Sequence, residues 1–385
     1  MKRIVYLDNN ATTPVDPLVL EAMLPYYKQE YGNASGIYSK GQSAKIAIEK
    51  ARTVIGEALG TEPVDIIFVS GGTEADNFAI KGVAYSYQNK GRHIITTKVE
   101  HSAVLKTCQY LEKNGFSVTY LDVDKTGLVS PEDVKNAITD RTILATVMHS
   151  NNEVGTVQPI QAIADICKEK GVLFHTDAVQ SFGKIPLDVE KMGVDLLSLS
   201  AHKIYGPKGI GILYVRKKVD LIPMMHGGPH ERKLRAGTEN VPLIVGFGKA
   251  VEIAVKNMSE EPDRIRNLRD MLHQGLLSSL THLHLNGHPT QRLPGVLNIG
   301  FEYVEGESII LNFDMKGICA STGSACTSGS LEPSHVLTAM GVDPVISQGS
   351  VRFSVGRMNT EKDIKYCIKV IPPIIKRLRE MSPLS

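Results

Sequence analysis

The sequence predicts an α/β protein in which helices cover both faces of a mostly parallel central sheet. Short apolar runs alternate with segments of helical period, and glycines follow two of the helical segments. Strands and helices in alternation indicate β-α-β units, whose parallel strands are buried on both sides. In chain order, the predicted strands are 66–69, 93–96, 117–121, 143–147, 172–175, 196–199 and 211–215.

Two helical segments between these strands have well-marked ends. Apolar residues recur at helical spacing through 44–58, and Gly60 follows. The segment 160–167 has the same spacing, and Gly171 follows it. Ligands of such sheets bind beyond the carboxyl ends of the strands. Residues that come directly after a predicted strand are therefore candidates for a functional site.

The pattern changes near the segment 258–262. A long charged helix follows, then a strand at 294–299 and shorter mixed elements. A chain of 385 residues is also long for a single domain. We therefore predict a large domain over 13–257 and a smaller α+β domain formed by 1–12 and 258–385.

Composition argues against several classes of protein. Lysine and arginine number 43 against 41 acidic residues, and this balance is atypical of a nucleic-acid-binding protein. Apolar runs stay well short of the ~18 residues of a membrane span, and the N-terminus turns polar too soon for a signal peptide. Five cysteines without a C-x-x-C pair indicate neither a disulfide framework nor a zinc site. We expect a cytoplasmic protein that binds neither nucleic acid nor membranes.

Lys203 and Asp177 suggest a site for an aldehyde cofactor. Each stands at the end of an apolar run, Lys203 within the sequence Ser-Ala-His-Lys. A lysine can bind an aldehyde as a Schiff base, and a carboxylate can keep a pyridine nitrogen protonated. Gln180, about one turn after Asp177, could hydrogen-bond a ring hydroxyl. Taken alone, Lys203 could equally be a surface lysine and Asp177 a helix N-cap.

Two further motifs follow predicted strands. Ser-Gly-Gly-Thr at 70–73 opens a helical segment, where free N–H groups and the helix dipole favour a phosphate. A capped strand-to-helix turn explains the same residues without a ligand. His101 could stack on a ring or carry a proton, although a lone histidine is more often structural.

The cysteines differ in their surroundings. Cys108, Cys167 and Cys367 fall on apolar helical faces and are predicted to be buried. Cys319 ends an apolar run. Cys326 has only small or polar neighbours, so it is either an accessible nucleophile or a harmless loop cysteine. Together with the cofactor site, it suggests sulfur chemistry on an amino acid.

Nine segments of the chain resemble the cysteine desulfurases of the NifS/IscS type. These enzymes belong to aminotransferase class V and have the fold-type I architecture of pyridoxal 5'-phosphate enzymes. No segment is decisive alone, but together they span nearly the whole chain in the family's order. The segments are YLDNNATT (6–13), SGGTEADN (70–77), VEH (99–101), NNEVG (151–155), HTDAVQS (175–181), SAHK (200–203), RAGTEN (235–240), GSAC (323–326) and VRFS (351–354).

The resemblance implies pyridoxal 5'-phosphate as the cofactor, bound through Lys203. It implies that Asp177 pairs with the ring nitrogen, that Gln180 contacts the ring oxygen, and that His101 stacks on the ring. The residues implied at the phosphate are Gly72, Thr73, Ser200 and His202. Thr238 would reach the phosphate of a neighbouring subunit's cofactor, which implies a homodimer.

The resemblance also implies a substrate site and a reaction. Arg352 and Asn152 would hold the carboxylate of L-cysteine, and Asn152 would also lie at the cofactor. Lys203 would move the Cα proton, and His101 is the candidate for deprotonating a thiol. Cys326 would take the sulfur as a persulfide and leave L-alanine. An iron–sulfur scaffold protein of the NifU/IscU type would then accept the sulfur for cluster assembly.

Two rival functions remain open from the sequence. One is another pyridoxal-phosphate enzyme of the same fold, either an aminotransferase or a lyase that acts on cysteine sulfinate or selenocysteine. The other is a sulfur-carrier scaffold with a vestigial cofactor pocket. The presence of Lys203 together with Asp177 argues against a vestigial pocket.

Overall fold

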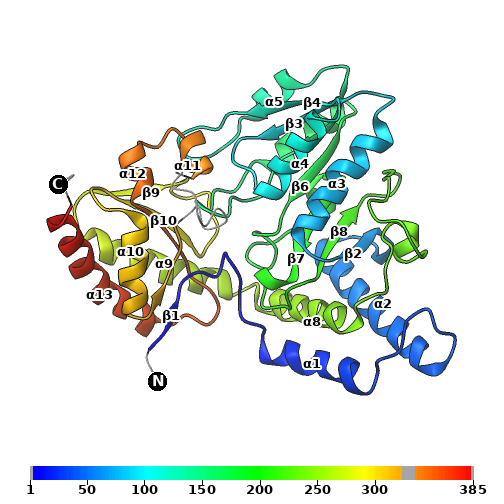
Figure 1. The fold of residues 1–385 in the computed structure, drawn as a ribbon, viewed down its shortest axis with the longest axis horizontal. Coiled ribbons are helices and arrows are strands. Elements are labelled where there is room, and N and C mark those ends of the chain that lie inside the picture. The colour runs from blue at the N-terminus through cyan, green and yellow to red at the C-terminus, as the bar shows by residue number, and fades with distance from the viewer. Residues whose placement is uncertain (1–2, 323–333, 383–385) are drawn as a thin grey trace.

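The computed structural model describes residues 3–322 and 334–382. It contains a large unit built on a seven-stranded sheet and a small unit built on a three-stranded sheet (Figure 1). The predicted α/β class with an additional smaller α+β part is confirmed. None of the described helices combines the length and the apolar character needed to cross a membrane.

The large sheet is mostly parallel, as predicted. Its strand order is β2-β8-β7-β6-β5-β3-β4, and only the pairs formed by β8 are antiparallel. The carboxyl ends of the other six strands therefore lie along one edge. The strands are β2 (Ile66–Val69), β3 (His93–Thr97), β4 (Ser117–Leu121), β5 (Thr142–Thr146), β6 (Leu173–Asp177), β7 (Leu196–Ser200) and β8 (Gly211–Val215).

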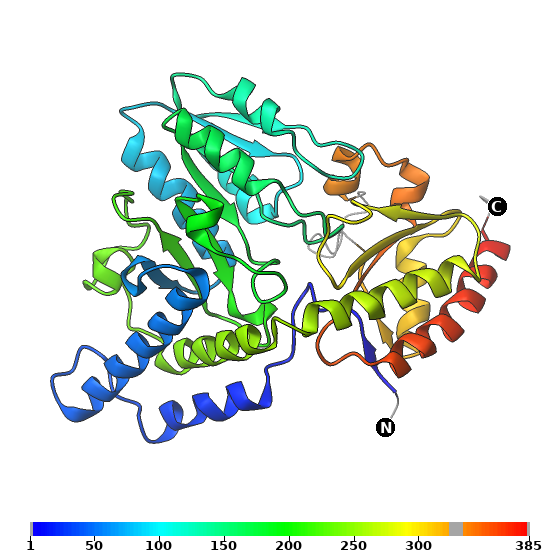
Figure 2. The same ribbon diagram turned by 180° about the vertical axis from the view of Figure 1, so that it is seen from behind.

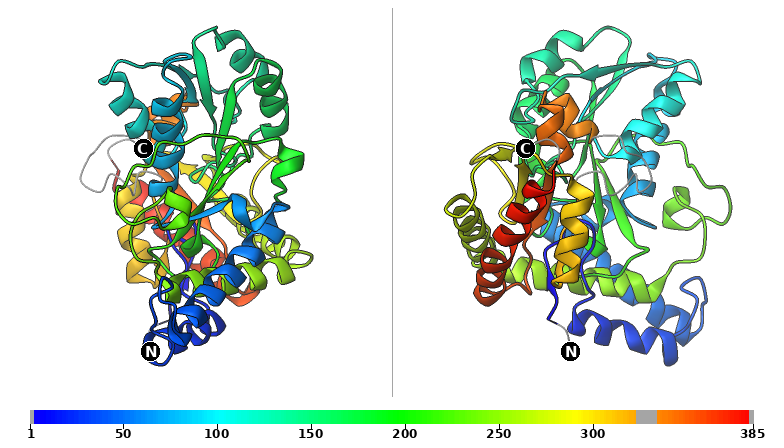
Figure 3. Two further views of the ribbon diagram at one scale, coloured as in Figure 1. Left: turned by 90° about the vertical axis from the view of Figure 1, so that its right-hand side faces the viewer. Right: turned by 60° about the vertical axis from the view of Figure 1, so that its left-hand side comes forward.

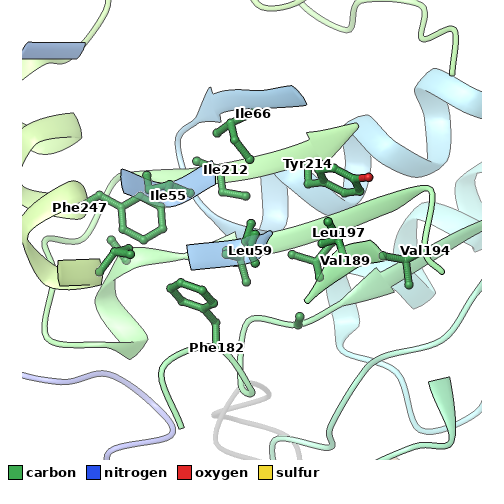
Figure 4. Packing of buried hydrophobic residues seen from close by; sticks show 14 of the residues in the cluster. Ile55, Leu59, Ile66, Phe182, Val189, Val194, Leu197, Ile212, Tyr214 and Phe247 are labelled. Atoms are coloured by element: carbon green, nitrogen blue, oxygen red, sulfur yellow. The ribbon is translucent and has the colours of Figure 1, made fainter. Parts of the chain in front are cut away.

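Helices cover both faces of this sheet. On one face, α2 (Ser39–Leu59), α6 (Ile160–Glu169) and α8 (Val241–Asn257) share an apolar cluster with alternate strand residues (Figure 4). On the other face, α3 (Gly72–Tyr87) and α4 (Ser102–Glu112) pack on the intervening residues. This use of both faces explains why the strands are apolar throughout. The remaining helices of the unit are α1 (Pro17–Lys28), α5 (Pro131–Ala137), α7 (Val189–Met192) and the short 3-10 helices η1 (Pro63–Asp65), η2 (Ala201–Lys203) and η3 (Glu231–Lys233).

The small unit combines both ends of the chain. An antiparallel sheet of order β12-β10-β9 is packed against helices, and β1 pairs in parallel with β11 beside it (Figure 2). The strands are β1 (Val5–Tyr6), β9 (Leu283–Asn286), β10 (Val296–Phe301), β11 (Ile318–Cys319) and β12 (Ser350–Ser354). The helices are α9 (Glu261–Leu277), α10 (Gly306–Met315), α11 (His335–Ala339), α12 (Pro344–Gln348) and α13 (Glu361–Glu380).

The two units have separate apolar cores. One core draws on residues 19–254, whereas the other joins Val5 and Leu7 to residues 268–378. A small cluster in which Val99 and Val154 contact α11 links the units. From these separate cores we propose two domains, 13–257 and 1–12 with 258–385. The segment between β1 and α1 passes from one unit to the other (Figure 3).

A buried ion pair fastens the segment around η3 to the sheet edge. Arg52 of α2 donates to both carboxylate oxygens of Glu231 at 2.8 and 2.7 Å, and each side chain is only 4% exposed. Glu231 also accepts from the backbone N–H of Phe68 in β2 at 2.8 Å. The pair is bidentate and lies in a low-dielectric interior, so removing either partner leaves a buried charge.

We expect Arg52→Met to lower the free energy of unfolding by about 3 kcal/mol, because the Glu231 carboxylate stays buried without its partner. Urea unfolding followed by circular dichroism measures this loss. Lys98→Met is the control, since the Lys98–Asp122 pair is exposed and such pairs contribute below about 1 kcal/mol. Equal losses in the two variants would contradict the prediction.

Candidate active site

A cavity of about 200 Å³ lies beyond the carboxyl ends of the parallel strands. Nine of the twelve predicted site residues line it: Gly72, Thr73, His101, Asn152, Asp177, Gln180, Ser200, His202 and Lys203. They lie at the carboxyl ends of β6 and β7 or in the segments that follow β2, β3, β5, β6 and β7, and these ends meet because the strands run in one direction. The structure therefore brings most of the predicted site together at one edge of the sheet.

Asp177 and Lys203 follow neighbouring strands. Asp177 ends β6, is 6% exposed, and accepts from the backbone N–H of Val179 at 2.9 Å. It caps a turn and not a helix, so the alternative reading as a helix N-cap is wrong. Burial raises the pKa of Asp177, while the charges of His101 and Lys203 lower it. A cation bound against this carboxyl would favour its charged form.

Lys203 lies in η2, directly after β7. Its ammonium group donates to the carbonyl oxygens of Asn10 and Ala11 at 2.6 and 2.8 Å. These acceptors belong to the segment that connects the two units. They hold the lysine at the cavity, where its amino group can reach an aldehyde.

His101 caps the N-terminus of α4. Its Nδ1 accepts from the backbone N–H of Ala103 at 3.1 Å, so the neutral ring carries its proton on Nε2. Burial lowers the pKa of His101, although the Asp177 carboxylate opposes this effect. The ring can stack and can donate from Nε2. To act as a base through Nδ1 it must first release Ala103.

The start of α3 forms a cradle for an anion. Gly71 has a φ of +154° at the N-cap, and a Cβ atom on Gly72 would come within 2.9 Å of Val179. The free N–H groups of this helix end face a hollow that Thr73, Ser200, His202 and Lys208 also line. Burial lowers the pKa of His202 to about 4, and the nearby lysines add to this. The imidazole is therefore neutral and can donate a hydrogen bond.

Arg352 and Thr238 do not line the cavity. Arg352 of β12 is buried, donates to Asp8 at 2.7 Å and donates to the carbonyl oxygen of Asn152 at 3.1 Å. Its Nε has no hydrogen-bond partner among the described residues. Thr238 is exposed on the segment after η3. A substrate carboxylate at Arg352 would share the guanidinium with Asp8.

Three cysteines have the predicted surroundings, whereas Cys326 falls outside the described residues. Cys108, Cys167 and Cys367 are free and buried on helices. Burial raises the pKa of each of these thiols to about 12, which suits side chains that only fill the core. Cys319 is half-buried in β11.

Asn10 is a site residue that analysis of single motifs missed. Its carbonyl oxygen accepts from Lys203 and from Gln180, the latter at 3.0 Å. Its side chain accepts from Lys184 at 3.1 Å and donates to the carbonyl oxygen of Asn152 at 3.0 Å. The segment 6–13 contributed to the family resemblance, but an asparagine near the N-terminus gives no local signal of these contacts.

Two further buried carboxyl groups lie near Asp177. Asp76 lines the cavity, and burial raises its pKa well above the usual range, with the Asp177 charge adding to the shift. Glu100 accepts from the backbone N–H of Met148 at 2.9 Å and from Thr97 at 2.7 Å. Burial raises the pKa of Glu100 to about 8 despite these hydrogen bonds.

The sequence profile of the aminotransferase class-V family matches residues 5–367. The chain belongs to this family. Among curated relatives, cysteine desulfurase IscS of Methanosarcina thermophila is 56% identical over 383 residues, which cover 100% of this chain and 95% of the relative. Cysteine desulfurase IscS of Clostridium botulinum is 52% identical over 386 residues, which cover 100% of this chain and 97% of the relative.

Solved structures of family members agree with this assignment. A NifS-like protein has a TM-score of 0.93 at 42% identity, with 98% of this chain and 100% of that chain covered. SspA in complex with cysteine has a TM-score of 0.82 at 40% identity, with coverages of 91% and 98%. The chain is therefore a pyridoxal-phosphate-dependent cysteine desulfurase, as the sequence resemblance implied.

The cavity fits the family's cofactor. Three groups occur together around one space: a lysine that can bind an aldehyde, a buried carboxyl that favours a cation, and a helix N-terminus that favours a phosphate. These are Lys203, Asp177 and the start of α3. They match the aldehyde, the ring nitrogen and the phosphate of pyridoxal 5'-phosphate.

The raised pKa of Glu100 predicts a pH effect on stability. Glutamate in an unfolded chain has a pKa of about 4.3, so the folded protein binds more protons up to pH ~8. Stability contributed by this group therefore falls as the pH rises through that window. Glutamine cannot ionise, so it escapes this loss. From pH 5 to pH 8, the free energy of unfolding of Glu100→Gln should rise relative to that of the wild type by on the order of 3 kcal/mol. Urea unfolding of the cofactor-loaded proteins measures the difference.

Glu74→Gln is a control of opposite sign. Burial raises the pKa of Glu74, but hydrogen bonds from Arg235 and Ser70 lower it by more, so the pKa is lowered overall. The free energy of unfolding of the wild type then falls relative to that of this variant as the pH drops below about 4.3. A pH-independent difference for Glu100→Gln would refute the assignment of a raised pKa.

Proposed function

We propose that this cysteine desulfurase converts L-cysteine to L-alanine, places the sulfur on Cys326 as a persulfide and serves iron–sulfur cluster assembly. The observation that carries this proposal is the pairing of Lys203 with Asp177 in one cavity beside His101. The structural relative SspA was solved with cysteine, which supports L-cysteine as the substrate. Relatives named IscS support the role in sulfur supply.

The residues divide the first half of the reaction between them. Pyridoxal phosphate supplies an electron-withdrawing ring that acidifies the Cα–H bond of a bound amino acid. Asp177 keeps the ring nitrogen protonated, because its buried carboxylate is stabilised by a cation. Lys203, once cysteine has displaced it, takes the Cα proton and later returns it. Asn10 and Ala11 hold its amino group close by.

Arg352 and Asn152 orient the substrate. The guanidinium is buried and its Nε is unpartnered in the described part of the chain, so it can donate to the carboxylate of cysteine. Asp8 and the carbonyl oxygen of Asn152 fix the plane of the guanidinium. Lysine at this position could not reproduce such a planar arrangement of donors.

Sulfur transfer requires a second thiol. The Cys326 sulfur forms a bond to the substrate sulfur as the substrate C–S bond breaks, and the electron pair of that bond stays with carbon. One proton leaves the Cys326 thiol and one reaches the substrate carbon, so cysteine and a thiol become alanine and a persulfide. His101, with its proton on Nε2, can donate in this step.

We propose that the active unit is a homodimer. Thr238 is exposed and lies away from its own cavity, while Arg235 on the same segment is fixed to Glu74 of α3 at 2.9 Å. Exposed apolar side chains on α1 and the segment after it offer a contact surface: Leu18, Leu20, Leu24, Tyr27, Tyr31, Ile37 and Tyr38. A second subunit that covers this surface could bring its Thr238 to the phosphate cradle.

We further propose that the sulfur acceptor is an iron–sulfur scaffold protein of the NifU/IscU type and that the enzyme works in the cytoplasm. The cysteines within the described ranges are free thiols, which suits a reducing compartment. A lyase or an aminotransferase of the same fold is the alternative activity. It would use Lys203 and Asp177 in the same way but would not need Cys326.

Cys326→Ala separates these two activities. The variant should bind the cofactor and respond to cysteine but form neither alanine nor persulfide, because no external thiol takes the sulfur. Alanine production and the mass of the wild type after brief exposure to cysteine, with about 32 Da added at Cys326, are the measurements. Cys108→Ala and Cys167→Ala are controls that should keep activity and lose roughly 1 kcal/mol of stability. Alanine formation by Cys326→Ala at the wild-type rate would favour the lyase.

Mixed dimers test the assignment of Thr238. Lys203→Ala and Thr238→Ala subunits should each form weakly active homodimers. When they are co-expressed with different tags, each heterodimer should contain one intact site, since the wild-type Lys203 of one subunit meets the wild-type Thr238 of the other. We expect about half of the wild-type desulfurase rate per heterodimer. Heterodimers without recovered activity would place Thr238 in the site of its own subunit.

A further inference from the structure

A second lysine, Lys184, hydrogen-bonds Gln180 of the cofactor site, and the chemistry above does not use it. Lys184 lies in the turns that follow β6, directly after Gly183, which has a φ of +71°. Its amino group donates to Oε1 of Gln180 at 3.0 Å and to Oδ1 of Asn10 at 3.1 Å. Gln180 and Asn10 are 6% and 3% exposed, so the three side chains form a network that is largely closed to water.

This network determines which way the Gln180 carboxamide points. A carboxamide can turn about its last bond and exchange its oxygen for its nitrogen. The charged amino group of Lys184 can only donate, so it requires the amide oxygen. The carbonyl oxygen of Asn10 can only accept, so it requires the amide nitrogen, which lies at 3.0 Å. Turning the amide would set a donor against a donor and an acceptor against an acceptor.

We propose that Lys184 is a positioning residue that fixes the Gln180 amide nitrogen toward the ring oxygen of pyridoxal phosphate. The inference rests on the proposed role of Gln180 at that oxygen. The amide nitrogen carries two N–H groups, of which Asn10 takes one. The second remains available to a ligand in the cavity that Gln180 lines. A donor at the ring oxygen stabilises its anionic form.

The surroundings of Lys184 suit this role over a broad pH range. Burial lowers the pKa of Lys184 to about 7, and the positive charges of Lys203 and Arg352 add to the shift. Both the charged and the neutral amino group can donate to Gln180 and Asn10. A neutral Lys184 could also accept a hydrogen bond, but the carbonyl oxygen of Asn10 still requires the amide nitrogen, so the orientation of the amide is maintained in both forms.

A double-mutant cycle tests the proposal. Lys184→Met is compared with the wild type, and again in a Gln180→Leu background, all as cofactor-loaded proteins. The measurement is the pH midpoint at which the visible absorption band of the cofactor changes. Loss of a donor to the anionic ring oxygen should raise this midpoint by about one pH unit in the otherwise wild-type protein. In the Gln180→Leu background, Lys184→Met should add no further shift, because the amide is already absent.

Two outcomes overturn the proposal. An unchanged midpoint in Lys184→Met shows that Lys184 does not orient the amide. A shift of equal size in both backgrounds shows that the lysine acts through its charge and not through Gln180. If near-ultraviolet circular dichroism shows that Lys184→Met is misfolded, the cycle is run with Lys184→Gln.

The same preparations separate this inference from the proposed function. The wild type should carry a borohydride-reducible cofactor on Lys203 and release alanine from cysteine. Failure of these two measurements would refute the proposed roles of the main site. If the wild type passes both measurements but Lys184→Met shifts the pH midpoint equally in the two backgrounds, only the role of Lys184 is refuted.

Discussion

The active site depends on the hydrogen bonds of Asn10, which lies where the two units meet. Its carbonyl oxygen receives Lys203 and Gln180, and its side chain donates to the backbone of Asn152. Its own N–H donates to the side chain of Ser354 in β12 at 2.9 Å. Lys203, Gln180 and Asn152, which we propose to bind cofactor and substrate, thus all hydrogen-bond to one residue. A displacement of this segment would disturb all of them together.

Burial gives the site its chemical character. Three carboxyl groups, those of Asp76, Glu100 and Asp177, lie in a small volume where water cannot solvate their charges, and the pKa of each is raised. The same burial lowers the pKa of His101 and so favours the neutral ring. A protonated pyridine nitrogen against Asp177 would favour the charged form of that carboxyl. The buried carboxyl of Asp177 thus suits the ring nitrogen of pyridoxal phosphate.

We propose that the two units contribute different parts of the reaction. The large sheet supplies the cofactor pocket, because its parallel strands deliver several loops to one edge. The small unit supplies Arg352 from β12, and Cys326 belongs to the stretch of sequence between β11 and α11. The proposed substrate ligand Arg352 therefore comes from the small unit and not from the large sheet.

Local sequence patterns predicted the strands of the large sheet, its mostly parallel class and most of the residues that line the cavity. The predicted strands 66–69, 117–121 and 211–215 agree with β2, β4 and β8, since continuous apolar runs and the turns that bound them are local properties. The predicted helix 44–58 proved longer, as α2 begins at Ser39 without a side-chain cap that would mark its start. Only the tertiary structure revealed Asn10 and Lys184 at the site. Their partners are mostly more than a hundred residues distant along the chain, and an interaction between such distant residues leaves no local pattern.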